Sequence, residues 1–189
     1  MAITGILLAA GRGRRFDPSG VENKLLQTMA DGEIVVAASA KNMLAVLPRV
    51  VAVVREGDDK VAALLGRLGC EVRVCATADL GMAESLTTAI EHTKGAEGWL
   101  VGLGDMPRVR PDTMRALVAT IERGARIAAP VFEGRRGNPV AFSAYHLPLL
   151  LALEGDQGAR AILKSHAVSE VVVDDEGVVR DIDTKQDLI

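Results

Sequence analysis

One segment near the start of the chain combines glycines with positive charge. It reads Ala9, Ala10, Gly11, Arg12, Gly13, Arg14, Arg15, Phe16, and Lys24 follows a few residues later. Glycines let the backbone approach a ligand closely, and their N–H groups can surround phosphate oxygens. The four cations, against the single acidic residue Asp17 before Glu22, predict a binding loop for a polyanion such as a triphosphate. A solvated basic turn is the alternative.

Two well-known phosphate-binding motifs do not fit this loop. The dinucleotide motif G-x-G-x-x-G requires a third glycine at position 16, where the chain has Phe16. The Walker motif G-x-x-x-x-G-K-[ST] is absent from the sequence. A flavin or nicotinamide oxidoreductase is therefore disfavoured.

A second segment, residues 79–85, combines a flexible glycine with the expected beginning of a helix. We expect a helix from Ser85 to His92, with Ser85 as its N-cap residue and free N–H groups in its first turn. Those N–H groups, next to Gly81, suit contacts to a nucleoside. The alternative is that Ser85 only caps its own helix.

Carboxylates stand at two further places. Asp105 follows an apolar strand directly, within Gly104, Asp105, Met106 and Pro107. Among so many cations it would be useful for holding a divalent metal between phosphates, and a turn or capping aspartate is the alternative. Asp181 and Asp183 share one face if residues 178–182 form a strand. Asp183 is also a candidate N-cap of a short last helix, residues 184–189.

The elements that would position these groups follow from the apolar pattern. Short β-branched runs alternate with helical windows up to residue 131. The expected strands are 4–8, 50–54, 71–75, 99–103 and 127–131, and the expected helices are 34–46, 59–68, 85–92 and 111–123. This alternation predicts the α/β class, a Rossmann-like three-layer sandwich with a mostly parallel sheet. In such sheets ligands bind beyond the C-terminal ends of the strands, where we expect these loops to lie.

After residue 131 the regular alternation of expected strands and helices ends. We expect a strand, a Gly-rich turn and a strand over residues 132–142, then short helices at 147–153 and 159–165. Strands are expected at 169–173 and 178–182, around a solvated acidic turn of Asp174, Asp175 and Glu176. No linker or repeat is visible, so residues 1–189 are expected to form a single domain with a mixed C-terminal part.

Composition narrows the function classes. The 189 residues are 49% hydrophobic, and 22 basic against 25 acidic residues give a net charge of −3. That balance argues against a nucleic-acid binder, and no apolar run is long enough to cross a membrane. Residues 1–20 carry glycines and arginines where a signal peptide would need an apolar stretch, so we expect a cytoplasmic protein.

The cysteines and histidines are not expected to do chemistry. Cys70 and Cys75 are five residues apart in an apparent strand, so they should point to opposite faces as buried or half-buried thiols. His92, His146 and His166 are scattered, without metal spacing or an obvious nucleophile.

Seven short segments complete the pattern: LLAAGRGRRF (7–16), NKLL (23–26), GMAESL (81–86), GDMP (104–107), GRRGNPVAF (134–142), GDQGAR (155–160) and DIDT (181–184). In this order, and spanning nearly the whole chain, they resemble the MobA-like nucleotidyltransferase family, specifically its molybdenum cofactor cytidylyltransferase branch. The resemblance implies a fold of the nucleotide-diphospho-sugar transferase type, in agreement with the expected strands.

The resemblance also implies a reaction: transfer of CMP from CTP to the terminal phosphate of molybdenum-bearing molybdopterin, with release of pyrophosphate and with Mg²⁺ as cofactor. Within the family the sequence LAAG is associated with the cytidine branch and LAGG with the guanosine branch, so Ala10 favours CTP. The implied partners are CTP, a molybdopterin-type substrate, and a molybdenum hydroxylase or its chaperone. Positioning and charge stabilisation would dominate catalysis, because both reactants are anionic.

Residue roles follow from the resemblance. Lys24, Arg15 and Asp105 are the expected catalytic residues, and Asp105 with Asp183 would hold Mg²⁺. The expected acceptor-binding residues are Asn138, Gly155, Asp156 and Arg160. The expected nucleotide-binding residues are Leu8, Ala9, Ala10, Gly11, Arg12, Gly13, Arg15, Lys24, Gly81, Met82, Ser85, Gly104 and Asp105.

Three positions depart from the family pattern. Asn23 replaces the usual Asp, Ala83 a common Gly, and Asn138 a frequent His. Asn138 can still donate and accept hydrogen bonds, but it cannot titrate. Two rivals stay open: a guanylyltransferase or a sugar- or alditol-phosphate nucleotidyltransferase on the same scaffold, and a non-catalytic nucleotide-binding protein that delivers a cofactor.

Overall fold

The computed structural model describes residues 2–156 and 158–189. Within these residues an eight-stranded sheet has the order β3-β2-β1-β4-β7-β5-β6, and β8 pairs with β5. The strands are β1 (Ile3–Ala9), β2 (Val50–Arg55), β3 (Glu71–Cys75), β4 (Gly98–Leu103), β5 (Ile127–Phe132), β6 (Arg135–Arg136), β7 (Val140–Ser143) and β8 (Ser169–Val172).

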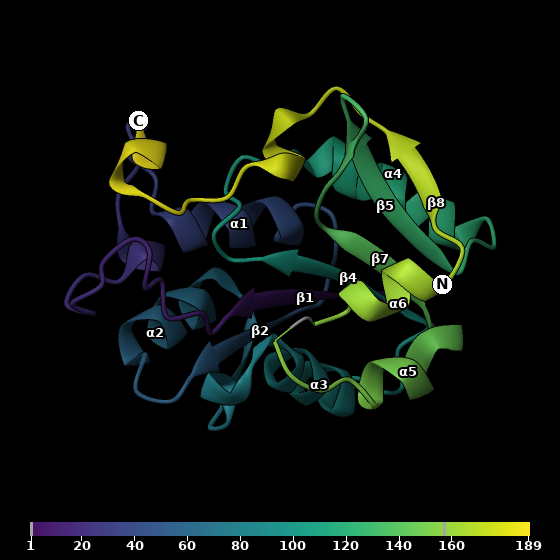
Figure 1. Ribbon diagram of the computed structural model, residues 1–189, viewed down its shortest axis with the longest axis horizontal. Helices are drawn as coiled ribbons and strands as arrows, with labels where there is room; N and C mark the ends of the chain where they lie inside the picture. Colours follow the sequence, from purple (N-terminus) through teal and green to yellow (C-terminus); the bar gives the residue numbers. More distant parts are fainter. Residues whose placement is uncertain (1, 157) are drawn as a thin grey trace.

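Helices cover both faces of this sheet. They are α1 (Val35–Leu44), α2 (Asp59–Leu68), α3 (Met82–His92), α4 (Pro111–Glu122), α5 (Leu147–Leu151) and α6 (Arg160–Ser165). One core contains apolar side chains of α1, α2 and α4, and a second core contains those of α3, α5 and α6. Figure 1 shows α1 and α4 on one side of the sheet and α3 and α5 on the other. The expected three-layer α/β sandwich is confirmed.

The sheet is parallel from β3 to β4 and contains antiparallel pairs beyond β4. β1 pairs in parallel with β2 and with β4, whereas β7 runs antiparallel between β4 and β5. The loops after β1 and β4 therefore leave the same edge of the sheet, as predicted from the alternating pattern. The change of direction at β7 is the expected mixed C-terminal part.

Several local predictions hold for identifiable reasons. α2 ends at Gly69, whose φ of 102° is a left-handed conformation that glycine adopts without strain. α4 begins at Pro111, where a missing N–H costs nothing. Cys70 and Cys75 are both buried and free, and they belong to the two different cores, which confirms their opposite faces.

The predicted strand over residues 178–182 is wrong. The chain instead forms a 3₁₀ turn, Glu176–Val179, followed by irregular backbone. The reason is backbone packing: a Cβ on Gly177 would lie 2.3 Å from the Arg108 carbonyl oxygen, and the Val178 carbonyl accepts from Asn138 N–H at 2.8 Å. Val178 and Ile182 are both buried, so their apolar spacing reflects packing of an irregular segment.

Two helix beginnings were also predicted wrongly. α3 starts at Met82, because Gly81 adopts a φ of 139° and the Ala83 N–H finds a partner in the Gly155 carbonyl. Ser85 is therefore a buried residue of the first turn and not the N-cap. At the C-terminus Thr184, not Asp183, caps the turn Lys185–Leu188, in a reciprocal capping box with Asp187.

Two further expectations need correction. Asp175 is buried, not solvated, because it accepts from the Arg110 N–H at 2.9 Å and from the Thr113 hydroxyl at 2.7 Å, where it supports the beginning of α4. The histidines are not all scattered: the rings of His146 and His166 pack perpendicular at 5.1 Å between centroids.

Among the described residues, no helix is long and apolar enough to cross a membrane.

Candidate active site

A pocket of about 430 Å³ opens at the carboxyl ends of β1 and β4, beside the beginning of α3. It brings together loops that lie far apart in the sequence. The residues that line it are Leu8, Ala9, Ala10, Gly11, Arg12, Gly13, Arg14, Lys24, Leu25, Ala78, Asp79, Gly81, Met82, Ser85, Leu103, Asp105 and Asp156.

Most of the nucleotide-binding residues expected from the sequence line this pocket, and Arg15 and Gly104 are the two that do not. Gly104 serves the framework, since its N–H donates to the Leu8 carbonyl and its own carbonyl accepts from the buried Ser39 hydroxyl. Arg15 points outward with 81% of its side chain exposed. Arg14, which the sequence argument did not assign, lines the pocket instead.

Lys24 is the centre of the charged part of the site. Its Nζ donates to Asp105 Oδ2 at 2.6 Å and to the Ile182 carbonyl at 3.0 Å, and it lies 3.7 Å from Asp183 Oδ1. Only 10% of its side chain is exposed. The two carboxylates predicted to hold a metal therefore converge on one ammonium group.

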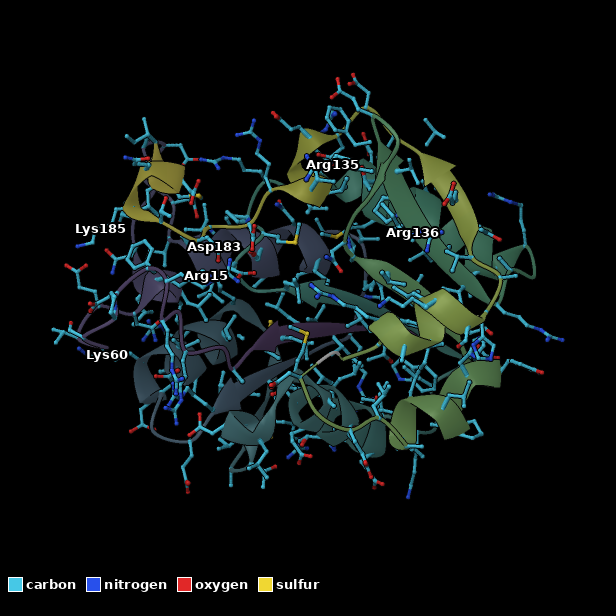
Figure 2. All side chains as sticks on the ribbon, viewed as in Figure 1. Arg15, Lys60, Arg135, Arg136, Asp183 and Lys185 are labelled. Atoms are coloured by element: carbon cyan, nitrogen blue, oxygen red, sulfur yellow. The ribbon has the colours of Figure 1, made fainter. Side chains whose placement is uncertain are left out.

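The C-terminal segment is held at this place by its backbone. The Ile182 N–H donates to the Asp105 carbonyl at 2.8 Å. Asp183 also accepts from Arg15 at 2.5 Å, and Figure 2 shows these two side chains side by side. The pKa of Asp181 is raised above its usual range, first by burial and then by the neighbouring Asp183. The irregular backbone thus brings Asp183 to the site without the strand that the sequence predicted.

Arg12 reaches across the pocket to Asp79. It donates through both Nε and Nη2 to the two carboxylate oxygens, and Arg55 lies 3.7 Å from the same group. The hydrogen bonds from Arg12 lower the pKa of Asp79. From the sequence, Asp79 was expected in the second loop but was given no role. The signal that could have identified it is an acidic residue in a loop expected at the same edge of the sheet as the basic loop.

The residues expected to bind the acceptor do not lie together. Gly155 contacts the α3 N-terminus and Asp156 lines the main pocket. Asn138 lies on the other side of Leu103, in a small cavity of about 10 Å³ that is shared with Met106. Arg160 is exposed at the start of α6 and does not line the pocket. Gln157, within the same GDQGAR segment, lies outside the described residues.

Comparison with known proteins agrees with this geometry. The chain is 29% identical over 198 residues to purine catabolism protein PucB from Bacillus subtilis, covering 98% of this chain and 93% of that protein. It is 28% identical to nicotine blue oxidoreductase from Paenarthrobacter nicotinovorans, covering 98% and 94%.

Solved structures and a family model point the same way. The crystal structure of Rv0371c from Mycobacterium tuberculosis H37Rv superposes with a TM-score of 0.85 at 28% identity, covering 99% of this chain and 95% of that one. A second structure of Rv0371c, in complex with manganese, gives a TM-score of 0.77 at 27% identity over 99% and 96% of the two chains. The model of the MobA-like NTP transferase domain matches residues 5–171. The chain therefore belongs to the MobA-like nucleotidyltransferases.

Proposed function

We propose that this protein transfers CMP from CTP to the terminal phosphate of molybdenum-bearing molybdopterin and releases pyrophosphate. The observation that carries the proposal is the pocket itself, in which the glycine loop and Lys24 face Asp105. Ala10 in the LAAG sequence supports CTP over GTP. We also propose that residues 1–189 form a single domain, and that the product is delivered to a molybdenum hydroxylase or its chaperone.

The chain's own groups account for the phosphate chemistry. An oxygen of the acceptor phosphate forms a bond to the α-phosphorus of CTP while the bond from that phosphorus to pyrophosphate breaks. Because the acceptor phosphate is already ionised, no general base is needed. The N–H groups of Gly11 to Gly13 and the side chain of Arg14 bind the triphosphate, and Lys24 neutralises the charge that grows on pyrophosphate.

The carboxylates fit a divalent metal. Mg²⁺ prefers oxygen ligands and keeps several waters, so Asp105 and Asp183 would be sufficient protein ligands. Among residues 2–156 and 158–189, no three His, Cys, Asp or Glu side chains form a metal cluster, which suits an ion shared with phosphates. When bound, the ion supplies positive charge against the α-phosphate. The structure of the relative Rv0371c in complex with manganese supports a divalent ion as cofactor.

The first test is nucleotide selectivity. Thermal unfolding with CTP, GTP, ATP or UTP, each with Mg²⁺, should show a rise for CTP alone. Saturation at 100 times Kd adds about 2.7 kcal/mol, which is roughly 5–11 °C for a domain of this size. A rise with GTP alone would reverse the base assignment.

The second test is turnover. Incubation with CTP, Mg²⁺ and molybdenum-bearing molybdopterin should release one pyrophosphate per dinucleotide formed. Binding of CTP without pyrophosphate release would favour a delivery protein. Release with sugar or alditol phosphates in place of the pterin would identify a different acceptor. Oxidation of NADH or NADPH by the protein would favour the redox activity named for one relative.

A further inference from the structure

The connection between α5 and α6 contributes Asp156 to the lining of the main pocket. The Gly155 carbonyl accepts from the Ala83 N–H at 3.1 Å, in the first turn of α3. This approach requires a glycine opposite: a Cβ on Gly81 would lie 2.4 Å from the Gly155 oxygen and 2.8 Å from Asp156 Oδ1. The carboxylate of Asp156 therefore lies next to Gly81, 75 residues away in sequence, at the beginning of α3.

Asp156 differs from the other acids of the pocket in its partners. Asp79 is paired with Arg12, and Asp105 is paired with Lys24. Among the residues that the structure describes, Asp156 has neither an ion pair nor a side-chain hydrogen bond. It is thus a carboxylate available to a ligand, in a pocket that is also lined by Arg12, Arg14 and Lys24.

Charge determines which half of a nucleotide such a group can face. A carboxylate repels phosphate, and the phosphates have their own place beside Gly11 to Gly13 and Lys24. An ionised carboxylate only accepts hydrogen bonds, so its partner must be an N–H or O–H donor. The nucleoside half carries two kinds of donor, the exocyclic amine of the base and the hydroxyls of ribose.

We propose that Asp156 is a specificity-determining residue that accepts a hydrogen bond from the nucleoside half of the nucleotide. This rests on the proposed function, and it moves Asp156 from the acceptor to the nucleotide. A uracil base presents a carbonyl oxygen where cytosine presents an amine, so a carboxylate facing this position repels UTP and favours CTP. A carboxylate facing ribose instead discriminates against 2′-deoxynucleotides.

The decisive variant is Asp156→Asn, because two effects have opposite signs. Removing a negative charge from the pocket should tighten the binding of any anion. The amide that replaces the carboxylate keeps only a neutral acceptor oxygen, so a hydrogen bond from a nucleoside donor loses its charge assistance and should weaken, by about tenfold. Weaker CTP binding despite the lower negative charge would therefore identify the hydrogen bond.

The experiment is isothermal titration calorimetry of the full chain with Mg²⁺ and CTP, UTP, 2′-deoxyCTP or inorganic tripolyphosphate. Wild type, Asp156→Asn and the control Glu154→Gln, an exposed residue of the same connection that does not line the pocket, are compared. For Asp156→Asn we expect CTP to bind about tenfold more weakly, with tripolyphosphate binding unchanged or tighter. A reduced preference for CTP over UTP identifies the base amine, and a reduced preference for CTP over 2′-deoxyCTP identifies ribose.

Three results would overturn the inference. The first is equal CTP affinity for wild type and Asp156→Asn, including the case where only the KM for the acceptor rises. The second is an equal loss for CTP and tripolyphosphate, which indicates a collapsed pocket. The third is a wild-type protein that binds tripolyphosphate but no nucleotide, in which case the proposed function fails as well. A wild-type protein that binds CTP while the variant is unaffected removes the inference alone.

Discussion

Replacing Lys24 by methionine should change stability and the response to Mg²⁺ together. Lys24→Met keeps the length of the side chain but removes the charge that lies 2.6 Å from Asp105 and 3.7 Å from Asp183. Asp105 would then lose its cation and Asp183 would keep only the exposed Arg15, with 20% and 26% of the two carboxylate side chains exposed. The apo protein should lose stability, and the vacated carboxylates should bind a divalent ion more readily.

The size of the effect follows from these distances. At an effective dielectric constant of about 20, unit charges 2.6 Å apart attract by roughly 6 kcal/mol. Desolvation of the partly buried charges offsets most of that attraction, so a net loss of about 2 kcal/mol is expected, below the roughly 3–5 kcal/mol for a fully buried pair. For a chain of this length the corresponding fall in Tm is about 4–8 °C.

Chemical unfolding in urea, with and without Mg²⁺, measures this directly. A matched control is Lys41→Met, which breaks the exposed pair of Lys41 with Glu33 and should cost no more than about 0.5 kcal/mol. Mg²⁺ without nucleotide should stabilise Lys24→Met more than wild type, because Lys24 no longer competes for Asp105 and Asp183. Turnover should nevertheless fall 10²-fold or more, on the scale of a lost charge contact in the transition state.

Three results would refute this reasoning. A Lys24→Met protein as stable as the Lys41→Met control would show that the ammonium group does not balance the carboxylates. Equal stabilisation of wild type and variant by Mg²⁺ would separate Asp105 and Asp183 from the metal. Normal turnover would remove Lys24 from the site.

Three further predictions rest on other observations. Gly81→Ala should destabilise the protein by about 1–3 kcal/mol and weaken CTP binding, because the φ of 139° and the contact with Gly155 both exclude a side chain. Urea midpoints measure the loss of stability and calorimetry measures the loss of CTP affinity. The control is Gly95→Ala, because a Cβ at Gly95 would meet open space. Burial raises the pKa of the Cys70 thiol to about 11 and Cys75 is also buried, so iodoacetamide should label neither in the native protein at pH 8 and both in urea; native labelling would contradict the packing. Burial, followed by the charges of His166 and Arg126, lowers the pKa of His146 in the folded protein. On acidification the unfolded chain therefore takes up a proton first, so the free energy of unfolding should fall as the pH drops below about 6.5. If the urea midpoint of His146→Gln has the same pH dependence as that of wild type, the loss belongs to other groups.

The sequence was informative where local chemistry and periodicity agree. Apolar runs such as residues 50–54 predicted strands because they are buried on both faces of the sheet, and Gly69 predicted a helix end because few other residues adopt its φ. The loops after β1 and β4 were placed at one edge by the general geometry of parallel sheets. Most of the pocket lining therefore followed from the sequence.

The failures share a physical cause: they lie where the backbone is held by contacts distant in sequence. The segment 178–182 contains the β-branched residues typical of a strand, but the Val178 carbonyl accepts from Asn138 and Gly177 packs on Arg108. Ser85 has the chemistry of an N-cap, but Gly155 already supplies the partner at that helix end. Neither contact has a signal within a few residues of the position that it determines.

The charges of the site are paired between loops that lie far apart in the sequence. Three cations of the first loop and its continuation form ion pairs with carboxylates of other loops: Arg12 with Asp79, Arg15 with Asp183 and Lys24 with Asp105. The Arg12 pair lines the pocket and is partly exposed, so a triphosphate can replace the carboxylate of Asp79 at little cost. Lys24 is largely buried, with only 10% of its side chain exposed, so loss of its pair with Asp105 would be more costly. If Lys24 turned to phosphate, Asp105 and Asp183 would be the residues to hold a divalent ion, whose positive charge would replace that of the ammonium group, so the proposed ion and the nucleotide would bind together.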